Sequence, residues 1–316
     1  MTNSYRPEGY LFGTRENRDY ISSKAGLERA MDEGRILEAS VMLCDSRMRL
    51  HVDLYGITGI IDKSEAVYSH DSRAVKEIAI ITRVGKPVCF KVMGFAVEDG
   101  REVAILSRRE AQKECASFYL SDVIEGDIVE AKVTHLDNFG AFVDIGCGIV
   151  SLLSIDCISV SRISHPSDRL SVGDKIFTVI KSIDRHSGRI FVSMRELLGT
   201  WEQNAREFEV GQTVAGIVRS IEPYGVFVEL SPNLAGLAEL KDGSDGDIAH
   251  VGEYAAVYIK SILPDKMKVK LVLIDSYHGD IPQQRLKYYI DCNEVTHINK
   301  WRYSPPSASK IIETVF

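Results

Sequence analysis

Hydrophobic and polar residues alternate along several short stretches of the chain, and one such pattern occurs twice. GDIVEAKVTHLDNFGAFVDI begins at residue 126 and GQTVAGIVRSIEPYGVFVEL begins at residue 211, so the two align without a gap at an offset of 85 residues. In both, an alternation of period two predicts a half-buried β-strand, and an aromatic-Gly-X-Phe-Val strand follows it. The chain therefore repeats a β-rich unit.

A fainter copy of the unit starts at Gly34. GRILEASVMLCDSRMRLHVDLYGITGIIDKSEAV has the same order of parts, and VGKPVCFKVMGFAVEDGREVAILSRRE from 84 corresponds to VGDKIFTVIKSIDRHSGRIFVSMRE from 172. In each, a charged turn with Gly joins two strands, which is typical of a hairpin. A unit of about five short strands over roughly 65 to 75 residues predicts a small closed Greek-key barrel, the OB-fold.

Helical patterns separate the units. REAQKECASFYLSDVIEG from 109 and RELLGTWEQNAREFEVG from 195 predict short linker helices, and SSKAGLERAMDEG predicts a helix before the first unit, with Ser22 or Ser23 as N-cap. Pro166 and Gly173 predict the start and end of a helical segment between the third and fourth strands of the middle unit. The expected fold is mainly β, with tandem five-stranded OB barrels and short linker helices.

The expected domain organisation follows from these patterns. It consists of an N-terminal extension and helix (1–33), a degenerate barrel (34–109), a linker helix (110–125), the best-defined barrel (126–198), a linker (199–210), a shortened barrel (211–275) and a C-terminal extension (276–316). The last segment is rich in Tyr and contains a Trp, so we expect it to be docked rather than disordered. The sequence assigns it no role.

Two aromatic residues, Phe139 and Phe142, flank a Gly-Ala pair in the middle unit. A regular strand would point the two rings to opposite faces. Glycine within a strand often marks a bulge, so we predict that a bulge at Gly140 brings both rings to one face. Tyr224 and Phe227 keep the same spacing in the third unit. Exposed rings of this kind stack on unpaired bases, whereas the alternative interpretation places them in the barrel core.

Basic residues near the aromatic strands are candidate phosphate contacts. Each of them alone is also consistent with a solvated surface charge. They can act as phosphate contacts only if closure of the barrel brings them close to the rings. The candidates are Lys132 and Arg189 in the middle unit and Arg219, Lys268 and Lys270 in the third.

At this level of detail the middle unit resembles the S1 domain, the OB-type RNA-binding repeat of bacterial ribosomal protein S1 and other RNA-handling proteins. The segments that carry the resemblance are GDIVEAKVTHLDNFGAFVDI, HPSDRLSVGD and SIDRHSGRIFVSMRE. Family members bind single-stranded RNA through two strand aromatics, a His after the third strand, and an Asp and an Arg in the last hairpin. The resemblance implies these RNA-binding residues: Phe139, Phe142, Asp184 and Arg189. Ser154 stands at the position of the family's His, and His165 in the later segment is a weaker substitute.

The other two units depart from the family pattern. In the third, Tyr224 and Phe227 match the rings, Glu239 stands at the His position, Lys268 approximates the Arg, and the connection between the third and fourth strands is shortened. The first unit has Met48 and His51, or Arg47 and Leu50, in place of the rings, and Asp62 at the His position, although Arg101 keeps the Arg. We expect the first unit to act in protein docking or scaffolding.

Composition excludes several other classes of protein. The net charge is −7 and the pI about 5.7, which argues against a duplex-binding protein with a strong basic excess. The six cysteines contain no CxxC spacing, so we expect reduced thiols and no metal. P-loop, GxSxG and HExxH motifs are absent from the sequence. The N-terminus has no apolar signal segment and no run is long enough to span a membrane, so we expect a cytoplasmic protein.

The predicted function is non-catalytic binding of single-stranded RNA, in translation with mRNA and the ribosome or in RNA metabolism. No cofactor, small-molecule substrate or membrane is expected. The alternative is a structural or protein-interaction scaffold on an RNA machine, with RNA contact incidental. An RNA-cleaving enzyme is a third class, and it would form products in a metal-dependent way.

Overall fold

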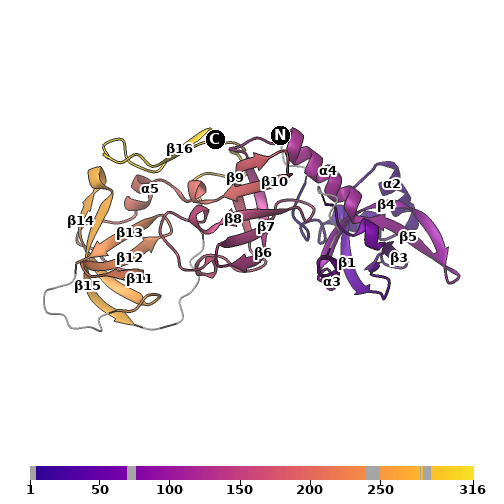
Figure 1. Cartoon of the computed structure of the whole chain (residues 1–316), viewed down its shortest axis with the longest axis horizontal. Helices are drawn as coiled ribbons and strands as arrows, with labels where there is room; N and C mark the ends of the chain where they lie inside the picture. Colours follow the sequence, from indigo (N-terminus) through magenta and orange to yellow (C-terminus); the bar gives the residue numbers. More distant parts are fainter. Residues whose placement is uncertain (1–4, 70–75, 240–248, 278, 280–285) are drawn as a thin grey trace.

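Three closed five-stranded barrels lie in a row along the molecule in the computed structural model (Figure 1). The structure describes residues 5–69, 76–239, 249–277, 279 and 286–316. In every barrel the strands are hydrogen-bonded in the order first, second, third, fifth, fourth, and the third and fifth strands are parallel. The predicted fold class, mainly β with tandem OB barrels, is confirmed.

The strands of the three barrels have these bounds. The first barrel contains β1 (Leu37–Cys44), β2 (Leu50–Asp53), β3 (Thr58–Ile61), β4 (Pro87–Glu98) and β5 (Arg101–Ser107). The middle barrel contains β6 (Ile128–Asp137), β7 (Gly140–Asp144), β8 (Val150–Ser154), β9 (Lys175–Asp184) and β10 (Arg189–Ser193). The third barrel contains β11 (Thr213–Glu222), β12 (Gly225–Ser231), β13 (Leu234–Ala238), β14 (Tyr254–Leu263) and β15 (Lys268–Tyr277). Most of its shortened connection, residues 240–248, lies outside the described residues.

Short helices connect and flank the barrels. The α-helices are α1 (Arg15–Ile21), α2 (Lys24–Asp32), α3 (Glu77–Ile81), α4 (Arg108–Ser121) and α5 (Trp201–Ala205). The 3₁₀ turns are η1 (Lys63–Glu65), η2 (Ile155–Cys157), η3 (Pro166–Asp168), η4 (Arg195–Leu198) and η5 (Pro264–Lys266). Ser23 is the N-cap of α2 and accepts a hydrogen bond from the Gly26 amide, because a hydroxyl satisfies an otherwise unpaired donor of the first turn. Helix α1, capped by Thr14, was not predicted.

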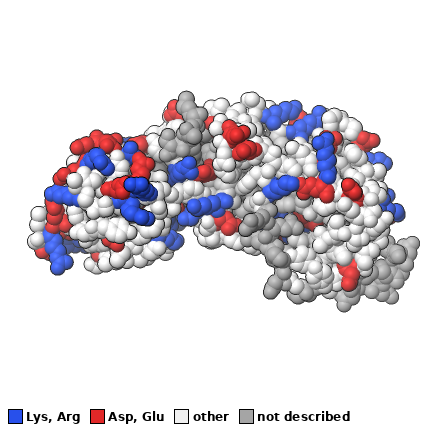
Figure 2. Space-filling model, turned by 180° about the vertical axis from the view of Figure 1, so that it is seen from behind, with Lys and Arg blue, Asp and Glu red and all other residues white. Residues whose placement is uncertain are grey.

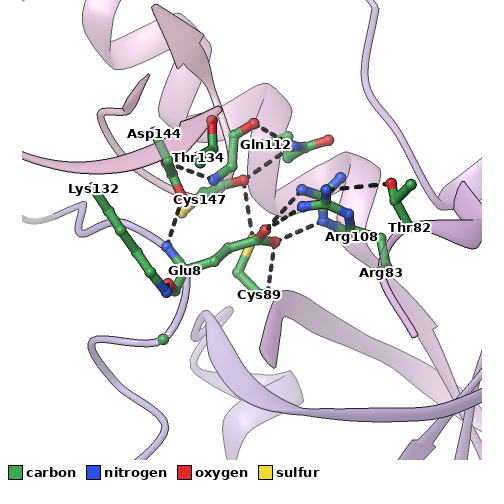
Figure 3. Close-up of polar contacts among 12 residues, drawn as sticks. Glu8, Thr82, Arg83, Cys89, Arg108, Gln112, Lys132, Thr134, Asp144 and Cys147 are labelled. Atoms are coloured by element: carbon green, nitrogen blue, oxygen red, sulfur yellow. Dashed lines mark hydrogen bonds and ion pairs between the residues drawn. The ribbon is translucent and has the colours of Figure 1, made fainter. Parts of the chain in front are cut away.

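An N-terminal strap, residues 5–14, joins the first and middle barrels, and Glu8 is its buried anchor (Figure 3). The Glu8 carboxylate accepts hydrogen bonds from Arg108 Nε (2.7 Å) and Nη2 (2.9 Å) and from the Cys89 amide (3.1 Å). The Glu8 amide donates to Asp144 Oδ2 of the middle barrel (2.7 Å). Burial alone would raise the pKa of Glu8, but the adjacent Arg108 lowers it, so the ion pair is kept inside the junction.

Buried polar contacts also join the middle and third barrels. Arg169, in the connection between β8 and β9, forms an ion pair with Glu229 on β12, and both side chains are almost fully buried. Arg219 on β11 bonds the same carboxylate (2.9 Å) and lies 3.3 Å from Asp168. Removing one member of such a group would leave an uncompensated buried charge, so the group fixes how the two barrels pack.

The C-terminal extension packs along both of these barrels. It contains β16 (Lys300–Arg302) and β17 (Glu313–Val315), which pair with each other. The Tyr289 amide donates to the Leu197 carbonyl, and the Tyr303 hydroxyl donates to the carbonyl of Asn233 (2.6 Å). Trp301 and Tyr303 belong to the core of the third barrel. These residues therefore stabilise the junction between the middle and third barrels.

Candidate nucleic-acid interface

A row of outward-facing side chains crosses four strands of the middle barrel. His135 pairs in register with Phe142, Phe142 with Leu152, and Leu152 with Phe191. None of the four is buried, although their strand neighbours Ala141, Val143, Leu153 and Val192 are. The rings of His135 and Phe142 are stacked, with centroids 6.0 Å apart and an interplanar angle of 25°. We call His135, Phe142, Leu152 and Phe191 the aromatic row.

Phe139 adds a second ring beside Phe142. Its side chain is 50% exposed, and its centroid lies 5.8 Å from that of Phe142 in an edge-on arrangement with an interplanar angle of 89°. The two rings therefore present differently oriented aromatic surfaces on the outside of the barrel. Neither ring is buried in the barrel core, which was the alternative interpretation of the sequence.

The predicted bulge at Gly140 is wrong. The register shift lies in β6, between Val133 and His135, and Phe139 is in the two-residue turn that joins β6 to β7. Because Phe139 is in a turn, strand alternation does not govern its direction. Gly140 has a different role, since a Cβ there would lie 2.4 Å from the Leu153 carbonyl oxygen, and only glycine permits this close approach of β7 to β8.

Asp184 and Arg189 face each other at the ends of β9 and β10. The Asp184 carboxylate accepts hydrogen bonds from the Ser187 hydroxyl (2.5 Å) and from the amides of Ser187 (3.1 Å) and His186 (3.0 Å). These bonds, led by that of the Ser187 hydroxyl, lower the pKa of Asp184. Asp184 thus shapes the hairpin turn. Arg189 is exposed and has no polar contact within the residues that the structure describes, so its charge is available to a ligand.

Ser154 and Lys181 are further polar side chains near the row, on β8 and β9. The Ser154 hydroxyl donates to Asp156, and Lys181 Nζ lies 2.9 Å from Cys157 Sγ in the turn that follows β8. Lys181 is a cation that sequence reasoning missed, because its position beside η2 depends on closure of the barrel. The position of the family's His is thus occupied by a hydroxyl paired with a carboxylate.

Three of the predicted contacts have other roles in the structure. Lys132 Nζ donates to the Glu8 carbonyl (2.9 Å), so Lys132 belongs to the first junction and not to the aromatic row. Arg219 is only 9% exposed and is held by Glu229 and Asp168, so it is not a free phosphate contact. The ring of His165 accepts the Ser167 amide through Nδ1 (3.1 Å) and caps η3. Lys132 and Arg219 thus serve as contacts of the two junctions.

The third barrel has a shorter version of the same face. Tyr224 is 62% exposed, and its ring lies 6.3 Å from that of Phe227 at an interplanar angle of 88°. Phe227 pairs in register with Leu237, and Leu237 pairs with Lys270. Lys270 therefore stands where the middle barrel has Phe191, and its Nζ lies 3.4 Å from Glu239. Lys268 is exposed at the start of β15.

The first barrel has ion pairs where the middle barrel has rings. Register places His51 at the position of Phe142, and its Nε2 lies 3.2 Å from Asp45 Oδ2. Arg49 bonds both Asp45 (2.9 Å) and Glu98 (3.0 Å). Aliphatic side chains, Leu43, Ile60 and Ile105, complete the row. None of these four register positions carries a Phe, Tyr or Trp ring.

Charge is mixed on the face of the molecule shown in Figure 2, where basic and acidic side chains are interspersed rather than gathered by sign. Within the described residues, no group of three or more His, Cys, Asp or Glu side chains is placed to hold a metal ion. No helix among them is long and apolar enough to cross a membrane.

Comparison with known proteins agrees with this geometry. The family model of the S1 RNA binding domain matches residues 122–195, which contain all five strands of the middle barrel. The middle barrel is an S1 domain. The chain is also similar to small ribosomal subunit protein bS1 of several bacteria. It is 28% identical to that of Rhizobium meliloti (strain 1021) over 234 residues, 28% identical to that of Leuconostoc lactis over 270, and 30% identical to that of Staphylococcus aureus (strain COL) over 198.

These alignments cover 70%, 82% and 59% of this chain but only 40%, 59% and 50% of the three relatives. The chain thus spans roughly half the length of the S1 proteins it matches. Among solved structures, a multidomain protein with nucleic acid binding domains from Streptococcus pneumoniae is 15% identical. The match covers 78% of this chain and 76% of that one at a TM-score of 0.24, which carries no conclusion about function.

Proposed function

We propose that this chain binds single-stranded RNA on the exposed rings of its S1 barrel and does not catalyse a reaction on it. The observation that carries the proposal is the placement of Phe139 beside the aromatic row, outside the barrel core. Ring faces on an OB barrel stack on bases, at about 1 to 3 kcal/mol per base. Bases of a duplex are already stacked and paired, so unpaired RNA is the form that fits.

The charged groups around the rings support the same ligand. Arg189 stands exposed on β10, two residues before Phe191, and Asp184 holds the turn beside it. Arg189 would contact a phosphate, and the Asp184 carboxylate orients the hairpin that carries it. With few free cations near the rings, each barrel would bind RNA weakly and with a shallow dependence on salt.

The setting we propose is translation in the cytoplasm, with mRNA and the ribosome as partners, or another step of RNA metabolism. The support is the similarity to bS1, which is named a small ribosomal subunit protein in each relative. The proposed domain organisation is the one predicted from the sequence, with the middle and third barrels as the RNA-binding units.

A titration with fluorescently labelled RNA tests this function. We expect wild-type protein to bind single-stranded RNA more tightly than the same sequence in a duplex. Phe139→Ala together with Phe142→Ala should weaken single-strand binding by about 2 kcal/mol or more, because two stacking surfaces are removed. Phe12→Ala is the matched control, since Phe12 is similarly exposed (43%) but lies on the N-terminal strap. Unchanged affinity in the double variant, with an unchanged melting temperature, would remove the stacking mechanism.

A protein-interaction scaffold is the second candidate function. The ion pairs and aliphatic side chains on the first barrel favour it for that barrel. Affinity capture with and without RNase separates the two functions, because a scaffold keeps its partner after RNA is digested. Loss of every partner on RNase treatment would contradict the scaffold.

A further inference from the structure

We propose that the middle and third barrels bind one RNA strand jointly, and that residues 164–168 of the middle barrel form a bridge between their two aromatic faces. We call these residues the bridge segment. The inference rests on the proposed function, because it needs both faces to bind single-stranded RNA. It adds that the two faces are parts of one continuous site.

The two faces are fixed relative to each other. Asn233, fully buried in the β12–β13 turn, accepts the Val160 amide (2.9 Å) and donates to the carbonyls of Arg195 (2.8 Å) and Gly199 (2.9 Å). Together with the buried pair of Arg169 and Glu229, these bonds tie the third barrel to the middle one. A strand bound to one face therefore meets the other face at a set position.

The bridge segment lies against both barrels, since its η3 turn contacts β6 and Asp168 pairs with Arg219 of β11. At its own barrel, the connection that contains it bonds β6, since the Gly173 amide donates to the Val133 carbonyl (2.8 Å) and the Val133 amide donates to the Asp174 carbonyl (2.9 Å). Val133 is two residues from His135 of the aromatic row.

On the other side, Asp168 contacts Arg219, and the next residue of β11, Ser220, is in register with Phe227. The bridge segment thus lies between β6, which carries His135, and β11, which carries the residue in register with Phe227.

The bridge segment offers groups that suit an RNA backbone. Ser164 and Ser167 are exposed, and Arg162, just before the segment, is exposed without a polar contact in the described part of the chain. His165 accepts a hydrogen bond through Nδ1, so the neutral ring carries its proton on Nε2, where it can be donated to a phosphate oxygen. Hydroxyl groups in the same segment can bond the 2′-OH.

Joint binding predicts a dependence on RNA length. An oligonucleotide of about 5 nucleotides would reach one face only, whereas one of about 20 would engage both. Binding the second face then becomes intramolecular, so the long RNA should bind at least about 100-fold more tightly than the short one. The long RNA should form a complex of one strand per protein.

The experiment is a calorimetric titration of the full chain with both oligonucleotides. We expect the variant with both Tyr224→Ala and Phe227→Ala to bind the long RNA about tenfold or more less tightly, because the second half of the site is removed. Two long strands per protein, or long-RNA affinity unchanged in this variant, would overturn joint binding. A failure of the proposed function would give another result. Wild-type protein would then not bind the short RNA, or the variant with both Phe139→Ala and Phe142→Ala would bind the short RNA as tightly as wild-type protein does.

A second variant tests the bridge segment. His165→Asn keeps an N-cap acceptor for η3 but removes the imidazole. The variant should therefore bind the long RNA about fivefold less tightly and bind the short RNA with unchanged affinity. His51→Asn is the matched control, because His51 pairs with Asp45 on the first barrel, which is not part of the proposed site. Equal affinity for the long RNA in His165→Asn and His51→Asn, or an equal loss for both RNA lengths in His165→Asn, would overturn the role of the bridge.

Discussion

Asp144 and Glu229 are corresponding residues of successive barrels, 85 positions apart (229 − 144), and each is a buried acid at the junction with the preceding part of the chain. Asp144 accepts the Glu8 amide of the N-terminal strap, and Glu229 pairs with Arg169 of the middle barrel. Each acid lies two residues after a half-buried ring, Phe142 or Phe227, on the same face of its strand. The two junctions therefore lie directly beside the proposed RNA-binding faces.

Glu229→Ala should destabilise the third barrel strongly. The variant leaves Arg169 and Arg219 buried with Asp168 as their remaining acidic partner, which costs about 3 to 5 kcal/mol for a broken buried ion pair. Urea unfolding followed by tryptophan fluorescence would measure this loss of stability, since Trp301 belongs to the core of this barrel. Glu209→Ala, an exposed acid before β11, is the control and should change stability by less than about 0.5 kcal/mol. Similar unfolding midpoints for the two variants would contradict the role of Glu229.

Phe191→Ala should weaken RNA binding by about 1 to 3 kcal/mol, because Phe191 ends the aromatic row. Phe177→Ala is a matched control. Phe177 is also half-buried in the middle barrel, but its ring packs edge-on against Tyr288 of the C-terminal extension, with centroids 5.7 Å apart. RNA titration alongside thermal melting distinguishes them, since only Phe191→Ala should lower affinity. An equal loss of affinity in both variants would indicate a general loss of structure instead.

The repeat and its strand order could be predicted from the sequence because short alternating strands and glycine turns are local features. Phe139 and Phe142 were found for the same reason, since their spacing recurs at Tyr224 and Phe227. Leu152 and Phe191 were not found, because β8 and β10 become neighbours only when the barrel closes. No local pattern marks such a pair.

The charged residues were the weakest part of the sequence prediction. Lys132 and Arg219 are close to the aromatic strands along the chain, yet their side chains are used at the two junctions. Glu8 is far from Lys132 in the sequence, and Arg219 meets Glu229 and Asp168 only when the third barrel closes and packs on the middle one, so no local pattern indicated these contacts. Arg189 differs because it lies at a hairpin end that the sequence places in solvent.

Salt dependence should separate Arg189 from Lys132. Arg189→Ala should lower the slope of log K against log salt concentration by about 0.7, as expected when one phosphate contact to a single strand is lost. Lys132→Ala should leave that slope unchanged and instead lower stability, because its Nζ holds the Glu8 carbonyl. Titrations at several salt concentrations measure both. A reduced slope in Lys132→Ala would place that residue at the RNA after all.

The N-terminal strap should make stability depend on pH. Burial, with a further contribution from the charge of Glu8, raises the pKa of Asp144 to about 7, and burial raises the pKa of Glu38 to about 7. Both carboxylates accept amide hydrogen bonds from the strap, Asp144 from Glu8 and Glu38 from Gly9, Leu11 and Phe12. Arg83 and Arg108 pair with Glu8 of the strap, Lys132 donates to its carbonyl, and Lys175 Nζ lies 4.2 Å from the centroid of the Tyr10 ring.

A carboxyl whose pKa is higher in the folded chain than in the unfolded chain holds an extra proton when folded, at any pH between the two values. The free energy of unfolding therefore falls as pH rises from about 4 to about 7, by up to about 1.4 kcal/mol per pH unit for each group. Urea unfolding at pH 5, 6, 7 and 8 should show this fall and a weaker dependence above 7. Asp144→Asn should remove about half of the slope, whereas Asp19→Asn, at an exposed position of α1, should leave it unchanged. Stability that is constant from pH 5 to 7 in the wild-type protein would mean that both carboxylates are already ionised inside the junction.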